Sequence, residues 1–215
     1  MKKANNILLI ILGIIFLLIV TYLIYNFILK KDNDKIVTKD NEIEEYGYVL
    51  YSNATKLYKD KFDELKELLS NSDVNYDKYA ELISELFIID FYTLDNKVAK
   101  NDIGGLQFIH PDEEENFLSK ASDTVYKYVK SNINGNRKQE LPEVSNINVE
   151  LVQNQPFEYN NKKDNSAYKV TLSWEYKKDL GYENKGNLIL VKEDKMLYVV
   201  EKSEEWFCKL FFYFT

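Results

Sequence analysis

The residue in this chain whose type and setting best suit chemistry is Asp90, a carboxylate inside the apolar run FIIDFY. Burial raises the pKa of a carboxyl group unless hydrogen bonds or a nearby cation hold its charge. Asp90 is therefore the only candidate for a catalytic residue, in the role of a general base. The competing interpretation places Asp90 at a solvated edge of its helix, or as an acceptor of backbone N–H bonds.

Two other segments carry groups that could act as acids, bases or metal ligands. The only histidine, His110, precedes Pro111 at an expected helix start. It is interpreted either as a lone acid–base group or as a residue flanking the helix N-terminus. The acidic run Asp112–Glu115 lacks the spacing of an EF-hand calcium loop and complements the positive end of a helix dipole. We predict no metal site and no cofactor.

Two further motifs have alternative interpretations. The triplet Asn53-Ala54-Thr55 fits an N-glycosylation acceptor, but in a bacterial protein we interpret it as helix capping. The apolar tail Trp206–Phe214 (WFCKLFFYF) is too short to span a bilayer and would promote aggregation if exposed. It packs back on the domain, lies at a membrane or partner surface, or is an artefact beyond a domain that ends near Lys202.

Composition excludes several classes of protein. Cys208 is the single cysteine, so an intramolecular disulfide is impossible and disulfide-stapled extracellular modules are excluded. The net charge is −7 and Arg137 is the only arginine, whereas nucleic-acid binding depends on neutralising phosphates. We predict no nucleic-acid partner. Abundant Lys, Asn, Ile and Tyr indicate an AT-rich bacterial genome.

A membrane anchor is the clearest feature of the sequence. The uncharged run Ile7–Leu29 would be about 34 Å long as a helix, against about 30 Å for the hydrocarbon core. No small-residue cleavage site follows it, so we expect a retained single-pass span rather than a signal peptide. We expect residues 1–6 to form a cytoplasmic tail and the domain after the span to lie outside the cytoplasm, although the lysines after the span favour the reverse orientation.

The remaining chain reads as a polar tether, 30–45, one soluble domain, 46–202, and the tail, 203–215. The helical half comes first. A short strand or extended segment at 46–51 precedes a helix capped by Ser52 or Asn53 that runs to Leu69. A second helix begins near Asn75 and is apolar almost all round, which is typical of a central, buried helix. A third begins at Pro111, and its apolar face extends to Val129.

Strands follow from Val144 onward. Alternating apolar residues predict strands at 144–152, 167–177, 188–191 and 196–200, the last three joined sequentially and therefore antiparallel. Phe157 and Tyr159 extend the edge of the first. Three helices packed on a four-stranded antiparallel sheet make an α+β fold.

The order of these elements resembles the NTF2-like fold, a curved sheet that forms a cone with helices. An anchor at Ile7–Leu29, the apolar helix around Leu82–Leu94 and the strands from Val144 to Val200 resemble the membrane-anchored VirB8-type components of conjugation and type IV secretion systems. The Asn-Pro-x-Gly loop of many VirB8 proteins is absent, so no functional residue transfers. The resemblance implies a non-enzymatic scaffold that self-associates and holds other envelope components.

Three functions remain open from the sequence. The first is a membrane-anchored, non-enzymatic interaction or scaffold domain of the bacterial cell envelope, part of a secretion or conjugation assembly, with the bilayer and other proteins as partners. The second is an NTF2-like ligand-binding or enzymatic domain that uses the cone cavity around Asp90. The third is an envelope protein of unassigned role with another α+β fold.

Overall fold

The structure is a computed structural model that describes residues 13–22, 37–159 and 162–203. The chain divides into two units, residues 1–36 with 132–137, and residues 37–131 with 138–215. In the first unit, residues 13–22 are helical, and the rest of the expected span Ile7–Leu29 lies outside the described residues. Within the described ranges, no helix is both long enough and apolar enough to cross a bilayer. The tail Trp206–Phe214 also lies outside them.

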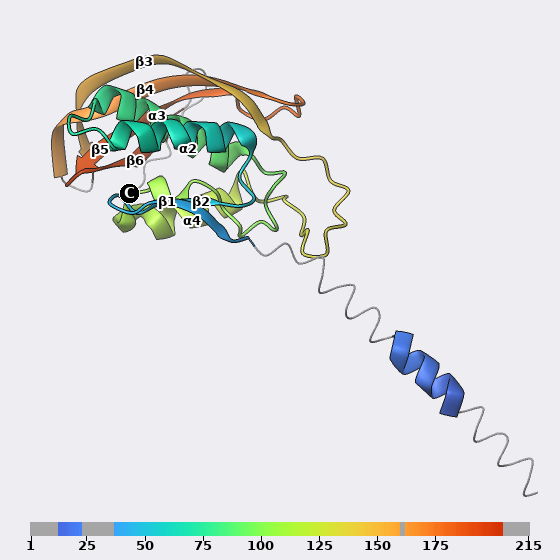
Figure 1. Cartoon of the computed structure of the whole chain (residues 1–215). Helices are drawn as coiled ribbons and strands as arrows, with labels where there is room; N and C mark the ends of the chain where they lie inside the picture. The colour runs from blue at the N-terminus through green and yellow to red at the C-terminus, as the bar shows by residue number, and fades with distance from the viewer. Residues whose placement is uncertain (1–12, 23–36, 160–161, 204–215) are drawn as a thin grey trace, which may run out of the picture. The chain divides into compact units, whose positions relative to one another are not determined.

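The second unit has the predicted α+β order of helices followed by an antiparallel sheet (Figure 1). The sheet has the strand order β3-β4-β5-β6, with every neighbouring pair antiparallel. A separate two-stranded sheet, β1-β2, precedes the helices. The elements are β1 (Lys39–Ile43), β2 (Tyr48–Tyr51), α2 (Lys56–Leu69), α3 (Tyr76–Tyr92), η1 (Leu106–Phe108), η2 (Pro111–Glu113), α4 (Glu114–Asp123), β3 (Val144–Tyr159), β4 (Lys162–Tyr176), β5 (Lys185–Glu193) and β6 (Met196–Ser203).

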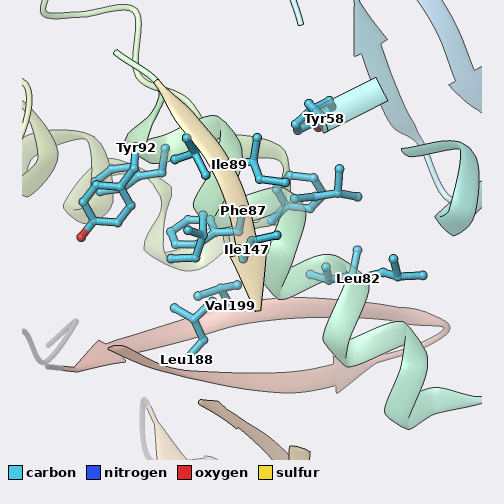
Figure 2. Packing of buried hydrophobic residues seen from close by; sticks show 14 of the residues in the cluster. Tyr58, Leu82, Phe87, Ile89, Tyr92, Ile147, Leu188 and Val199 are labelled. Carbon is cyan, nitrogen blue, oxygen red and sulfur yellow. The ribbon is translucent and has the colours of Figure 1, made fainter. Parts of the chain in front are cut away.

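Helix α3 lies at the centre of the fold, as its all-round apolarity predicts. It contacts α2 on one side and strands β3, β4 and β6 on the other. Residues all round the helix are therefore buried, including the four consecutive residues 86–89. Figure 2 shows part of this core, with Phe87 and Ile89 from α3 and Leu188 and Val199 from the sheet.

The starts of α2 and α3 are fixed by side chains that accept backbone N–H groups. Asn75 caps α3 by accepting from Lys78 N, as the sequence predicts. Thr55 caps α2 by accepting from Tyr58 N, so the expected cap at Ser52 or Asn53 is wrong by two or three residues. A cap must sit immediately before the first helical residue for its oxygen to reach the free N–H groups of the first turn.

Several element boundaries differ from the predicted ones. The predicted tether, 30–45, ends in strand β1, which is polar but pairs its backbone with β2. Strands β3 and β4 extend to a hairpin well beyond the apolar alternation, and their pairing shifts in register at residues 144–146, 149–151 and 155–157 of β3. The third helix ends at Asp123 rather than reaching Val129, because Thr124 leaves the helical region with ψ −99°.

Candidate functional site

Asp90 lies near the C-terminal end of α3, and both of its carboxylate oxygens are engaged. Oδ1 is 2.5 Å from Lys97 Nζ, and Oδ2 accepts the Gly105 N–H at 2.7 Å. The side chain of Lys97 is only 5% exposed, whereas that of Asp90 is 27% exposed. The carboxylate therefore compensates a buried ammonium group and holds the loop after α3 against the helix.

The loop between α3 and η1 is fixed by further buried contacts. The Tyr126 hydroxyl donates to Phe91 O at 2.7 Å and accepts the Gly104 N–H at 3.0 Å. A Cβ at Gly104 would lie 2.2 Å from the backbone oxygen of Asp90, so only glycine fits. Burial raises the pKa of Tyr126 well above its usual range, and the negative charge of Asp90 raises it further. Tyr126 thus stays a hydrogen-bond donor at neutral pH.

A small cavity lies beside Asp90. Its volume is about 40 Å³, against about 300–1,000 Å³ for typical ligand pockets. The Asn96 side-chain amide donates to Asn53 O at 3.2 Å, and its oxygen is buried without a hydrogen-bond partner among the described residues. This space suits a water molecule rather than a substrate. It is lined by Tyr51, Asn53, Ala54, Thr55, Tyr58, Ile89, Asp90, Thr93, Asn96 and Gln107.

His110 acts as a cap and a link between elements. Its Nδ1 accepts the Asp112 N–H at 3.2 Å, and its Nε2 is 2.5 Å from Glu193 Oε2. Because Nδ1 accepts a backbone N–H, Nε2 is the nitrogen that donates to the Glu193 carboxylate. The ring is 3% exposed and lies edge-on to Tyr159 and Tyr198. His110 thus joins the start of η2 to the end of β5.

The acidic run Asp112–Glu115 splits between different environments. Asp112 is mostly exposed, whereas Glu113 is buried. Across residues 37–159 and 162–203, together with 13–22, no three His, Cys, Asp or Glu side chains are grouped closely enough to hold a metal ion. Asn53 does not cap α2, and Thr55 of the same triplet does.

A second, larger cavity is the feature that sequence reasoning missed. It has a volume of about 380 Å³ and lies between α3, α4, β6 and the loop after β4. We call it the aromatic pocket, and it is lined by Phe87, Phe91, Tyr92, Phe117, Lys120, Ala121, Thr124, Val125, Gly181, Tyr182, Glu183, Val199 and Lys202.

The floor of the aromatic pocket is a set of contacting rings. Phe91 stacks on Phe87 with ring centroids 5.6 Å apart, and its ring is 5.4 Å from that of Phe117. Figure 2 shows Phe87, Tyr92 and Val199 of this lining within the core, with the Tyr92 hydroxyl pointing away from the other labelled side chains. Such rings offer a large apolar surface with defined stacking geometry.

The polar groups of the aromatic pocket bond to one another. Glu183 accepts the Tyr92 hydroxyl at 2.5 Å and pairs through both oxygens with Lys202 Nζ, at 2.8 and 2.6 Å. The backbone oxygen of Glu183 accepts the Tyr176 hydroxyl at 2.5 Å. This network fixes the loop after β4 at the pocket's edge. Within the network, Lys202 neutralises the carboxylate of Glu183.

A third depression near the connection between α2 and α3 is larger, at about 590 Å³, but its lining is mostly polar and charged. Binding pockets are typically apolar with a few placed polar groups. The aromatic pocket fits this description and the third depression does not.

The sequence contained part of the signal for the aromatic pocket. Phe87 and Phe91 on α3, and Phe117 and Ala121 on α4, are spaced four apart and so share a helix face. This spacing predicts apolar faces, and it does not distinguish a filled core from a pocket. Glu183 lies in an irregular loop after β4, where no periodicity indicates which way a side chain points.

Comparison with known proteins adds no relative: no family model matches the chain, and no curated protein or solved structure does.

Proposed function

We propose that this chain is a membrane-tethered, non-enzymatic interaction domain of the bacterial cell envelope, which holds an apolar side chain of a partner protein in the aromatic pocket. The single observation that carries the proposal is the pocket itself. It combines about 380 Å³ of ring-lined space with one internally paired charge network. Such a site favours burial of an apolar group, which is the main source of binding energy at protein interfaces.

The wider role follows from the order of elements and from the expected anchor. Helices followed by a four-stranded antiparallel sheet are consistent with an NTF2-like cone. An uncharged run at Ile7–Leu29 supports a tether to the bilayer, with the domain outside the cytoplasm. A domain of this kind would serve as a scaffold in a secretion or conjugation assembly and would self-associate or hold other components.

The alternative of chemistry around Asp90 has less support. Its two oxygens already bond to Lys97 and Gly105, and the adjoining cavity of about 40 Å³ has room for little more than water. A general base needs a free oxygen within hydrogen-bond reach of a substrate proton. Asp90 therefore fits a positioning role in the fold better than a catalytic one.

A photocrosslinking experiment in cells tests the proposal. A benzophenone amino acid replaces Tyr182, which lines the aromatic pocket, and in a matched chain it replaces Tyr128, which is 75% exposed and does not line it. We expect illumination to attach a discrete partner protein at position 182 and not at position 128. Equal labelling at both positions, or none at 182, would contradict the proposed function.

A further inference from the structure

We propose that the third depression is a binding site for a saccharide chain. Five segments border it: the turn between β1 and β2, the end of α2, the connection from α2 to α3, the start of α3 and the turn between β5 and β6. All of them belong to the second unit of the chain, and the depression shares no lining residue with the aromatic pocket. The inference therefore goes beyond the proposed function and can be tested separately from it.

The depression has the size of a ligand site and the polarity of a saccharide site. Its volume of about 590 Å³ falls within the range of about 300–1,000 Å³ for ligand pockets. Polar lining groups disfavour an apolar ligand, because burying them without hydrogen bonds costs free energy. A saccharide carries hydroxyl groups, each a donor and an acceptor, together with apolar C–H faces that pack on aromatic rings. A site for it therefore needs free polar groups beside aromatic rings.

The free polar groups come from the connection between α2 and α3, where Asn71, Ser72 and Asp73 line the depression. The Asn71 amide donates to two backbone oxygens of α2, at 3.1 and 3.2 Å, which leaves its side-chain oxygen as an acceptor. With the residues that the structure describes, the exposed side chains of Ser72 and Asp73 make no hydrogen bond or ion pair. Sugar hydroxyls that donate to the Asp73 carboxylate form charge-assisted bonds, which are roughly twice as strong as neutral ones.

Two half-buried tyrosine rings, Tyr46 and Tyr76, supply the surface against which a sugar ring packs. Both contact the fully buried Tyr79, whose ring centroid is 6.0 Å from that of Tyr46 and 6.0 Å from that of Tyr76. Lys192 Nζ lies 3.8 Å from the centre of the Tyr76 ring, but Lys192 does not line the depression. This ammonium group therefore does not stand between the ring and the depression. Tyrosine rings fixed in this way offer an amphipathic surface at a low entropic cost.

The charges of the depression favour a neutral ligand. Lys195 is the only cation among the described residues that line it, and its Nζ is 2.9 Å from Glu45 Oε1. A paired lysine offers little positive charge to a phosphate or another anion, and the carboxylate of Asp73 repels such a group. A neutral saccharide chain needs no unpaired cation and uses the carboxylates as acceptors for its hydroxyl groups.

Ligand-observed NMR tests this inference on the full chain in lipid nanodiscs, which avoid detergents with sugar headgroups. Saturation applied to the protein is transferred to the protons of a ligand that binds it. The probes are cellotetraose and chitotetraose, two neutral sugar chains, and tetraglycine, which has hydrogen-bonding groups but no sugar ring. We expect transfer to the C–H protons of at least one tetrasaccharide and none to tetraglycine.

Two variants with matched controls locate the binding. Asp73→Ala removes the free carboxylate, and Asp77→Ala is its control, because Asp77 is exposed on the first turn of α3 and does not line the depression. Tyr76→Ala removes a ring, and Tyr128→Ala is its control at a 75% exposed position outside the lining. We expect Asp73→Ala and Tyr76→Ala each to weaken binding at least about fivefold, equivalent to about 1 kcal/mol, and the controls to leave it unchanged.

Circular dichroism shows whether each variant is folded, and Asp73→Ala, in an exposed connection, decides the question if Tyr76→Ala does not fold. Absence of transfer to both tetrasaccharides would overturn the proposal. Equal transfer to tetraglycine would also overturn it, since it would indicate a peptide site. Binding that is unchanged in Asp73→Ala or in folded Tyr76→Ala would place the saccharide elsewhere and reject the site. None of these results alters the partner adduct expected at position 182, so the proposed function is judged separately.

Discussion

Asp90 illustrates the structural role that a carboxylate can have inside an apolar helix. The run FIIDFY indicates a buried acid. Such an acid is either a catalytic base or a structural residue held by hydrogen bonds, and the sequence does not distinguish these two roles. The structure places Asp90 between a buried ammonium group, Lys97, and the N–H of Gly105. Neither partner could be predicted, because each lies in the irregular loop after α3, where sequence spacing does not determine position in space.

This arrangement predicts that Asp90→Asn lowers stability. An amide oxygen can still accept from Gly105, but the amide group cannot neutralise Lys97, whose side chain is 5% exposed. Hydrogen bonds to charged groups contribute about 1.5–3 kcal/mol, and we expect a loss of that size in urea unfolding of the variant. Removing both charges, as Asp90→Asn with Lys97→Met, should cost less than the sum of the two single changes, since no buried charge is then left alone.

The same variant separates a structural role from chemistry. If Asp90→Asn unfolds at the same urea concentration as the wild type and yet abolishes the protein's role in cells, Asp90 is a reacting group. If the stability loss of the double variant equals the sum of the losses of the two single variants, the ion pair between Asp90 and Lys97 makes no measurable contribution to stability.

Among the helices and strands, hydrophobic periodicity predicted the elements that a buried face stabilises. It missed the strand segments that form through backbone pairing with a neighbouring strand. The all-round apolarity of α3 and the Asn75 cap follow from local patterns. Strand β1 does not, because only Ile43 of KDNEI is buried and the strand forms by pairing with β2. The hairpin of β3 and β4 extends through polar residues for the same reason.

The end of α4 illustrates a second kind of limit. Val125 and Val129 continue the apolar spacing of the helix, so the sequence predicts a longer one. In the structure the chain turns at Thr124, and the Tyr126 hydroxyl reaches Phe91 O and Gly104 N. A tertiary hydrogen bond of this kind outweighs a weak local preference for helix.

The loop after α3 gives a prediction at this scale. Gly105 has φ +80°, and a Cβ there would lie 2.8 Å from the Phe87 ring, whereas Gly47 has φ +74° and nothing within 4 Å. Gly47→Ala should lower the free energy of unfolding by about 1–2 kcal/mol, because alanine disfavours the left-handed backbone conformation. Gly105→Ala should cost about 1–3 kcal/mol more, because it also crowds the core. Urea unfolding of the two variants measures the difference. Equal losses of stability in the two variants would show that the loop adjusts to the added methyl group and does not hold the end of α3.

The whole molecule combines an expected anchor with a domain whose described residues form a ring-lined pocket. The sequence predicts the class of fold and the apolar faces of α3 and α4. It does not predict that Phe91, Phe117 and Tyr182 leave space between them. A pocket is a difference between the volume that the backbone encloses and the volume that side chains fill, and that difference depends on how all the elements pack.

We propose that the aromatic pocket binds a partner and that Asp90 performs no chemistry. The most direct measurement is the yield of the partner adduct at position 182 in three backgrounds. Thr124→Trp adds a bulky ring to the pocket lining. Asp123→Trp is the matched control, because it adds the same ring one position away on a residue that does not line the pocket. Asp90→Asn removes the carboxylate. We predict that Thr124→Trp lowers the yield at least about tenfold, equivalent to about 1.4 kcal/mol. Asp123→Trp and folded Asp90→Asn should keep it. An adduct that survives Thr124→Trp and disappears in a stably folded Asp90→Asn chain would contradict the account.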